Sequence, residues 1–351
     1  MNLFSSQYLP ETPDSDALSA NPAPIPKGPV GLLVVNLGTP DEPTPKAIRR
    51  YLQEFLSDPR VIELPQWLWQ IILRCFVLVR RPHALTPRYK EIWHERGSPL
   101  LVWSQAQAEG VQQRLQAEGL DVRAEVGMRY GNPSIAGAID ALRAQGCERI
   151  LCVPLYPQYA ASTTATAVDH VARHAARLRN QPELRFIKRY HNDAGYIDAL
   201  ARQIQAYWAE HGKPVRLLLS YHGLPRVTVE QGDPYHRDCM ETTMLLRQRL
   251  GEDGDRVYAS FQSRFGAQEW LQPYTEPLLR EWAKQGVSSV DVMCPGFLAD
   301  CLETLEEIQM ECRDAFLEDG GKQFRYLPCL NGDPVWVDAL AVIVKRNLGG
   351  W

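Results

Sequence analysis

The sequence has no excess of basic residues, since 38 Lys and Arg stand against 42 Asp and Glu among 351 residues, a net charge of −4. A nucleic-acid-binding protein needs a basic patch that neutralises phosphates, so this balance argues against such a partner. No apolar run reaches the roughly 18–20 residues that span a bilayer. The eight cysteines include no CxxC pair, which disfavours a disulfide scaffold or a zinc site and predicts a reducing, cytoplasmic environment.

Nucleotide-binding signatures are missing as well. The chain contains neither GxGxxG nor GxxxxGK[ST], and the first predicted strand runs into the loop Asn36–Pro40 instead. Without the glycines that bring a helix N-terminus close to a pyrophosphate, a dinucleotide-dependent dehydrogenase is disfavoured.

The first 27 residues contain Pro10, Pro13, Pro22, Pro24 and Pro26 among Ser, Asp and Asn. They lack both the basic start and the continuous apolar stretch of a secretory signal peptide. We therefore predict a disordered tail at 1–27.

Short runs rich in β-branched residues alternate with longer helical patterns, which is typical of βαβ units and parallel sheets. The runs are Val30–Leu37, Val122–Arg129, Arg149–Leu155, Leu184–Arg189, Val215–Ser220, Val257–Gln262 and Val290–Cys294. Several are apolar throughout, so both faces of these strands should be buried. The sequence therefore predicts an α/β protein with two Rossmann-like domains, each a parallel sheet flanked by helices.

The domain boundaries are predicted from the helical pattern that follows the third strand. This pattern covers Thr163–Asn180 and is expected to lead into a second set of strands beginning with Leu184–Arg189. The N-terminal domain would then cover 28–165 and the C-terminal domain 166–329. Residues 330–351 are expected to form a helix that packs back on the first domain.

One histidine stands where an apolar strand is expected to end. His222 follows the apolar run Val215–Leu219 and precedes Gly223 and Pro225, which favour a tight loop. In an open α/β sheet, ligands bind beyond the carboxyl ends of the strands. A single histidine at such a place is about as often structural as functional, and the neighbouring Gly and Pro favour the functional interpretation.

Three glutamates recur at four-residue spacing in a later helical pattern. On an α-helix, Glu303, Glu307 and Glu311 would form one ladder. Like charges at this spacing cost about 0.2–0.5 kcal/mol per pair, so a cation is expected beside them. Carboxylate rows are mostly solvated faces, but apolar residues such as Phe297 and Leu302 make the wall of a cleft equally plausible here. A histidine facing this row suits a reaction that removes protons from a substrate and handles a divalent metal.

The segment Leu64–Val79 carries more apolar residues than a helix with one buried face requires. A core helix is one interpretation. Trp67 and Trp69, followed by Arg80 and Arg81, favour the alternative of a cleft lip that contacts a membrane interface.

A series of short motifs occurs in order along nearly the whole chain from about residue 28. They are Asn36–Pro40, Gly97–Leu100, Met128–Tyr130, Tyr156–Tyr159 with Ser162–Thr164, Ser220–Pro225, Gly232–Tyr235, Phe261–Arg264, Trp270–Leu271, Cys294–Phe297, Glu303–Leu305 and Leu330–Gly332. In number and order they resemble the ferrochelatases, the family that inserts ferrous iron into a porphyrin in the last step of haem biosynthesis.

The resemblance implies roles for the histidine and the glutamates. In that family, the histidine of the strand-end loop and the glutamate of the E-T-L motif face each other across the porphyrin plane, which corresponds to His222 and Glu303. Metalation releases two pyrrole protons, and an imidazole of ordinary pKa near 6.5 suits their acceptance near neutral pH. Glu307 and Glu311 would then deliver the metal or export protons. Carboxylate and imidazole ligands suit ferrous iron, so all four residues are expected metal ligands.

The resemblance also implies a substrate pocket. Its apolar lining would include Leu37, Tyr130, Trp270 and Phe297, and its propionate contacts Ser98 and Arg129. Relatives that use coproporphyrin have tyrosine where this chain has Leu37, which points to protoporphyrin IX as the substrate and protohaem as the product. Relatives with an iron–sulfur cluster carry cysteines near the C-terminus, whereas the last cysteine here is Cys329. No cluster and no other tightly bound cofactor is therefore expected, and ferrous iron is a substrate.

Two alternatives stay open. A chelatase of the same fold could act on another tetrapyrrole or metal, such as coproporphyrin III, cobalt or nickel, although the apolar segment Leu64–Val79 fits protoporphyrin better. A non-catalytic haem carrier would need an axial ligand but no opposing acids, so the pair of His222 and Glu303 argues against it. We expect a cytoplasmic lyase in peripheral contact with the inner membrane face, with no nucleic-acid partner.

Overall fold

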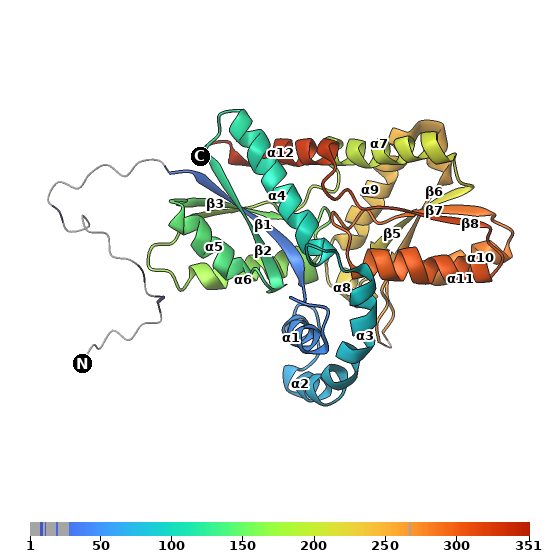
Figure 1. Cartoon of the computed structure of the whole chain (residues 1–351), viewed down its shortest axis with the longest axis horizontal. Coiled ribbons are helices and arrows are strands. Elements are labelled where there is room, and N and C mark those ends of the chain that lie inside the picture. The colour runs from blue at the N-terminus through green and yellow to red at the C-terminus, as the bar shows by residue number, and fades with distance from the viewer. Residues whose placement is uncertain (1–7, 10, 12–18, 20–27, 267) are drawn as a thin grey trace.

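Two four-stranded parallel sheets organise the molecule. The structure, a computed structural model, describes residues 8–9, 11, 19, 28–266 and 268–351. In spatial order, the first sheet contains β2 (Val122–Gly131), β1 (Val30–Thr39), β3 (Arg149–Pro154) and β4 (Glu183–Phe186). The second contains β6 (Val257–Gln262), β5 (Arg216–His222), β7 (Ser289–Met293) and β8 (Gln323–Leu327). The predicted α/β fold with two Rossmann-like halves is confirmed (Figure 1).

Helices cover both faces of the first sheet. One face carries α4 (Pro99–Ala117) and α12 (Pro334–Leu348), and the other carries α5 (Ile135–Ala144) and α6 (Thr166–Ala175). Successive β1 residues enter two different cores, because Leu32 and Val34 pack on the side of α4 while Leu33 and Val35 pack on the side of α5. The expected burial of both strand faces is therefore observed.

The second sheet is enclosed in the same way. One face carries α7 (Ala194–His211) and α9 (Tyr235–Leu250), and the other carries α10 (Thr275–Lys284) and α11 (Arg313–Glu318). Two short elements, α8 (Arg226–Glu230) and the 3₁₀ turn η3 (Gly251–Arg256), complete the connections. A single core contains both Leu32 of β1 and Leu217 of β5, so the two halves share a hydrophobic interior.

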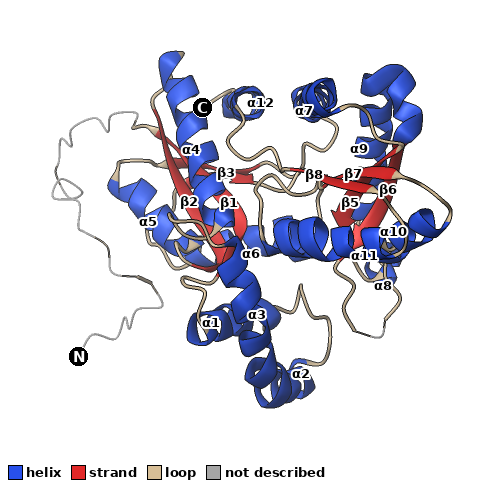
Figure 2. Cartoon of the chain, turned by 45° about the vertical axis from the view of Figure 1, so that its right-hand side comes forward, coloured by secondary structure: helices blue, strands red, loops and turns tan. Residues whose placement is uncertain are grey.

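A helical subdomain projects below the two sheets in Figures 1 and 2. It consists of α1 (Pro45–Leu56), α2 (Gln66–Ile72), the π-helical turn η1 (Leu73–Val77) and α3 (Leu78–Ile92). Pro45 occupies the first turn of α1, and the hydroxyl of Thr44 accepts a hydrogen bond from the Ala47 N–H at 3.3 Å, which caps this helix. The subdomain has its own core, in which Leu52, Leu73 and Tyr89 are buried.

Two further π-helical segments occur in the described part of the chain, η2 (Ala161–Ala165) and η4 (Glu303–Cys312). Such segments are rare and are found disproportionately at functional sites. The helix predicted at Thr163–Asn180 is thus shorter than expected, because α6 covers only Thr166–Ala175 and follows η2.

The strand pairing contradicts one predicted assignment. The strand predicted at Leu184–Arg189 was placed in the second sheet, but β4 pairs in parallel with β3 in the first. The helix α6 is an ordinary crossover that returns the chain to its own sheet. We therefore propose that the division of the chain lies after β4, within the connection through α7, and not near residue 165.

The C-terminal helix contacts α4 and β3 of the first half and also α7. In Figure 1, α12 and α7 lie side by side along the top of the molecule. The tail predicted at 1–27 lies outside the described residues, apart from Tyr8, Leu9, Glu11 and Ser19. No helix among the described residues has the length and apolar character needed to cross a bilayer.

Candidate active site

The strand β5 ends at His222, in register with Gln262 at the end of β6. The chain then turns tightly, and the Gly223 N–H donates to the Gln262 carbonyl at 2.8 Å. A Cβ on Gly223 would lie 2.7 Å from that carbonyl oxygen and 3.0 Å from the Trp270 ring, so only glycine permits this approach. His222 is thereby held at the carboxyl end of a central strand, as predicted.

The two nitrogens of the His222 ring have different surroundings. Nδ1 lies 2.7 Å from the Gly223 carbonyl oxygen, which can only accept, so Nδ1 carries the proton in the neutral ring. No described residue forms a hydrogen bond to Nε2. The ring centroid lies 6.4 Å from that of Trp270 and 6.3 Å from that of Phe297. The geometry thus presents a basic Nε2 lone pair between two aromatic side chains.

Glu303 is connected to this strand end through Gln262. The Gln262 side-chain amide donates to the Glu303 carbonyl at 2.8 Å, and its oxygen accepts from the Ser220 hydroxyl at 2.7 Å. The pKa of Tyr89 in the helical subdomain is raised, mainly because the side chain is buried and secondly because the charge of Glu303 is nearby. The Glu303 carboxylate therefore lies where the second sheet meets this subdomain.

The segment that carries the three glutamates is not the α-helix on which their ladder is predicted. The segment η4 is π-helical, with i to i+5 hydrogen bonds, and each carboxylate has a different environment. Glu307 accepts two hydrogen bonds from Ser263, while Glu311 lies on the surface and pairs with Arg88 of α3 at 3.0 Å. The predicted cation is thus present, but it contacts only the outer end of the row.

Arg88 also pairs with Glu306, which the four-residue spacing did not identify. The guanidinium lies 2.7 Å from the Glu306 carboxylate. Burial and the charge of Glu311 raise the pKa of Glu306 to about 7, against the opposing effect of Arg88. This contact joins α3 to η4 across a large sequence separation, and no local sequence signal could have revealed it.

The predicted substrate residues are divided between exposed and buried positions. Leu37, Trp270 and Phe297 are partly exposed, whereas Tyr130 and Ser98 are buried. Leu37 precedes Gly38, whose φ of +123° and contact with the Tyr130 carbonyl exclude any side chain. The Ser98 hydroxyl accepts from Thr39 at 2.8 Å, which ties the start of α4 to the end of β1.

Arg129, for which a propionate contact is predicted, is bound to other residues of the protein. Its side chain is only 6% exposed, and its guanidinium binds the Asp58 carboxylate and the Thr166 hydroxyl. The Tyr130 hydroxyl donates to the same carboxylate at 2.9 Å. Breaking a buried ion pair of this kind is strongly unfavourable, so Arg129 has a structural role in holding α1 against β2 and α6.

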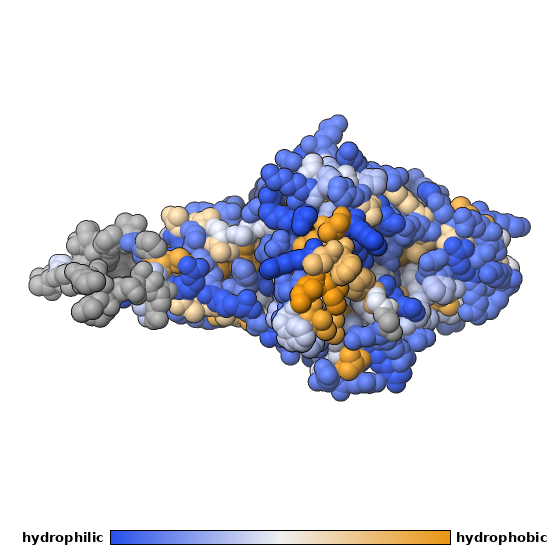
Figure 3. Space-filling view, turned by 90° about the horizontal axis from the view of Figure 1, so that it is seen from below, coloured by the Kyte–Doolittle hydropathy of each residue, from blue (hydrophilic) through white to orange (hydrophobic). Residues whose placement is uncertain are grey.

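Trp69 is likewise not part of an exposed surface. It is 5% exposed, and its indole N–H donates to the Leu56 carbonyl at 2.6 Å. Trp67, by contrast, is 72% exposed and belongs to an apolar patch. The patch consists of Leu64, Trp67, Leu68, Ile71, Phe76 and Val79, and Figure 3 shows apolar side chains gathered over this subdomain on the underside of the molecule.

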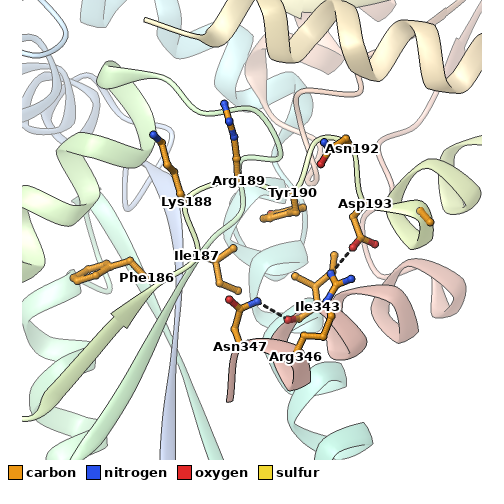
Figure 4. Close-up of a pocket in the computed structure, with 11 residues that line it drawn as sticks. Phe186, Ile187, Lys188, Arg189, Tyr190, Asn192, Asp193, Ile343, Arg346 and Asn347 are labelled. Carbon is orange, nitrogen blue, oxygen red and sulfur yellow. Dashed lines mark hydrogen bonds and ion pairs between the residues drawn. The ribbon is translucent and has the colours of Figure 1, made fainter. Parts of the chain in front are cut away.

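A separate pocket of about 420 Å³ lies between the β4–α7 connection and α12 (Figure 4). Its charged side chains are already paired, since Arg189 contacts Asp238, Arg346 contacts Asp193 and the Lys188 ammonium lies 4.8 Å from the centroid of the Tyr159 ring. None of the predicted site residues lines it. Across residues 8–9, 11, 19, 28–266 and 268–351, no group of three or more His, Cys, Asp or Glu side chains could hold a metal ion.

The profile of the family described as Ferrochelatase matches residues 29–348. The chain is 61% identical over 349 residues to the ferrochelatase of Bordetella pertussis, covering 99% of this chain and 96% of the relative. It is 55% identical over 321 residues to that of Azoarcus sp. strain BH72, covering 92% and 88%.

Two solved structures share the fold at low identity. SirB from Bacillus subtilis with Fe3+ has a TM-score of 0.52 at 17% identity, covering 70% of this chain and 90% of that one. CbiX, described as the terminal enzyme for siroheme biosynthesis in denitrifying bacteria, has a TM-score of 0.50 at 14% identity, covering 92% and 100%.

Proposed function

Because this chain belongs to the ferrochelatase family, whose members are lyases that insert iron into porphyrin for haem biosynthesis, we propose that it metalates protoporphyrin IX. We also propose that His222 and Glu303 are the residues that handle the protons and the metal. The observation that carries this proposal is the His222 ring, whose Nδ1–H is committed to the Gly223 carbonyl. The free Nε2 is the basic atom, and it stands between two aromatic side chains that suit contact with a flat macrocycle.

The reaction exchanges two pyrrole N–H protons for one ferrous ion. His222 Nε2 accepts the two protons one after the other and passes each to solvent, because imidazole is the side chain best suited to proton transfer near neutral pH. The Gly223 carbonyl holds the ring in the correct tautomer and stabilises the imidazolium that forms. The nitrogen lone pairs freed by deprotonation then bind the metal.

Glu303 supplies the carboxylate of the site. Oxygen and imidazole ligands suit ferrous iron, and a carboxylate close to the entering ferrous ion offsets the double positive charge of that ion. Glu307 and Glu311 are less available as metal ligands than Glu303. Ser263 donates a hydrogen bond to each carboxylate oxygen of Glu307, and Arg88 forms an ion pair with Glu311. We therefore assign them to outer positions, with Glu303 the carboxylate nearest the reaction.

An apolar substrate fits the residues around His222. Trp270 and Phe297 lie beside His222 and, like Leu37 of β1, carry no charge, whereas the Arg129 guanidinium is bound to Asp58 and Thr166. Protoporphyrin IX, with two propionates, suits this composition better than coproporphyrin III, with four. We also propose that the protein binds no iron–sulfur cluster, since its eight cysteines are spread along the chain and include no CxxC pair.

The substrate is tested by following porphyrin absorbance during anaerobic incubation with ferrous iron. We expect kcat/KM for protoporphyrin IX to exceed that for coproporphyrin III by at least about tenfold, a difference of ~1.4 kcal/mol in transition-state binding. Faster turnover of coproporphyrin would contradict the substrate assignment, and stoichiometric haem binding without turnover would favour a carrier. Acid-labile sulfide should be absent from the same preparation.

The apolar patch supports a peripheral membrane contact. Trp67 and Phe76 are 72% and 62% exposed, and such groups are stabilised at a bilayer interface. Arg80 and Arg81 are exposed after the patch, where each would add about 1 kcal/mol of attraction to anionic headgroups. A membrane contact here would bring the helical subdomain to the phase into which a poorly soluble porphyrin partitions.

Replacing Trp67 and Phe76 together by serine should weaken binding to anionic liposomes by roughly tenfold or more and raise KM for liposome-borne protoporphyrin. Sedimentation with vesicles measures the binding. The control is Val342→Ser, because Val342 is 57% exposed on α12, away from the patch. Equal loss in the control, or unchanged vesicle binding in the double variant, would rule out the membrane role.

A further inference from the structure

The residue that follows β6 has a backbone conformation that its side chain does not favour. Ser263 has a φ of +64°, and the other non-glycine residue with positive φ in the described part of the chain is Asn331. A side chain in the left-handed region costs free energy, and residues held there concentrate at functional sites where other contacts fix them. A compensating contact is therefore expected.

That contact is the carboxylate of Glu307 on η4. The Ser263 backbone N–H donates to Oε1 at 2.6 Å, and the Ser263 hydroxyl donates to Oε2 at 2.5 Å. Hydrogen bonds to an ionised acceptor are among the strongest in proteins. The left-handed turn brings both donors of one residue onto one carboxylate, which explains why the strained conformation persists.

Glu307 also interacts electrostatically with His222 and Glu303, the two residues proposed to act on the porphyrin. Burial raises the pKa of Glu307, and the hydrogen bonds from Ser263 and the nearby His222 oppose that rise. The preceding residue, Gln262, holds the Glu303 carbonyl at 2.8 Å. Two consecutive residues at the end of β6 therefore bind η4 at two positions, one turn apart.

We propose that Ser263 is a positioning residue, whose two hydrogen bonds to Glu307 fix the acidic helix so that Glu303 stands opposite His222. The proposal rests on the proposed function, in which His222 and Glu303 act on the porphyrin. Ser263 itself contacts no reacting atom and acts only through Glu307. Its loss should therefore slow the chemical step and leave porphyrin affinity unchanged.

Phe265, two residues after Ser263 in the same loop, provides a comparison with Ser263. The Arg81 guanidinium of α3 lies 4.5 Å from the centroid of the Phe265 ring, so Phe265 joins the loop to the helical subdomain. Among the described residues, no hydrogen bond or ring contact joins Phe265 to η4. A change at Phe265 should therefore leave the contacts between Ser263 and Glu307 intact.

Two substitutions at one position separate the contributions of Ser263. Ser263→Gly tolerates the positive φ and keeps the backbone donor, whereas Ser263→Ala loses the hydroxyl and keeps the strain. We expect kcat to fall roughly 3-fold to 10-fold in the glycine variant and further in the alanine variant, with KM for protoporphyrin within about twofold of wild type. Phe265→Leu, which leaves both hydrogen bonds of Ser263 in place, should retain the wild-type kcat.

The matched control is Ser289→Ala, which removes a hydroxyl that accepts from the Val215 N–H at 3.0 Å, outside the site. Its kcat should equal that of wild type. Wild-type kcat in both Ser263 variants, or a change confined to KM, would overturn the proposal. Thermal melts identify the folded fraction, and the glycine variant decides the question if the alanine variant does not fold. Failure of the wild-type protein to metalate protoporphyrin is a distinct result, which contradicts the proposed function as well.

Discussion

His222→Ala is expected to lower the turnover number for iron insertion by about 10²-fold to 10⁴-fold, the usual contribution of a positioned general base. The structure gives the reason, because Nε2 is the free basic atom of a ring whose other nitrogen is bound to the Gly223 carbonyl. Porphyrin binding should persist, since the Trp270 and Phe297 rings remain in place. Fluorescence quenching on titration with protoporphyrin measures binding, and anaerobic metalation measures turnover.

His222→Asn provides a sharper version of the same test. Its side-chain amide can still donate to the Gly223 carbonyl, but it offers no basic nitrogen. We expect this variant to be as slow as the alanine variant. His211→Ala is the remote control, because His211 lies exposed at the end of α7. An asparagine variant with near wild-type turnover would show that His222 only shapes the loop.

Glu303→Gln is expected to produce the second large loss, about 10²-fold in turnover, because it removes a charge at nearly constant shape. Glu311→Gln is the matched control and should cost less than about threefold. The Glu311 side chain is 50% exposed and pairs with Arg88 on the surface, where ion pairs contribute little. Initial rates at varied ferrous iron concentrations measure both variants. A greater loss in Glu311→Gln than in Glu303→Gln would reverse the assigned order.

The fold could be predicted because its strands are short apolar runs separated by helical patterns. Periodicity does not show which sheet a strand joins, and for that reason β4 was assigned to the wrong half. Nor does it separate an α-helix from a π-helix, since both place residues four apart within about 40° of each other on one face. Periodicity also cannot show that Ser263 and Arg88, which are distant in sequence, bind Glu307 and Glu311.

The site could be predicted in part. The strand-end position of His222 was visible from the apolar run before it and the Gly and Pro after it. Trp67 and Trp69 could also have been separated, because residues two apart on an α-helix point about 200° apart and cannot share one exposed face. The partners of Arg129 and Arg88 could not have been predicted. Asp58 and Glu306 are distant from these arginines in sequence, and only folding brings each pair together.

The two halves contribute different things to the enzyme. His222 on β5 and Glu303 on η4 both belong to the second half, whereas Leu37 and the apolar patch belong to the segment that begins with β1. Substitutions at Leu37 in the first half would alter part of the proposed pocket lining and leave the proposed pair of His222 and Glu303 intact. In the proposed arrangement, the part of the substrate lining that comes from the first half can therefore vary during divergence, or be redesigned, without change to the residues proposed for metalation.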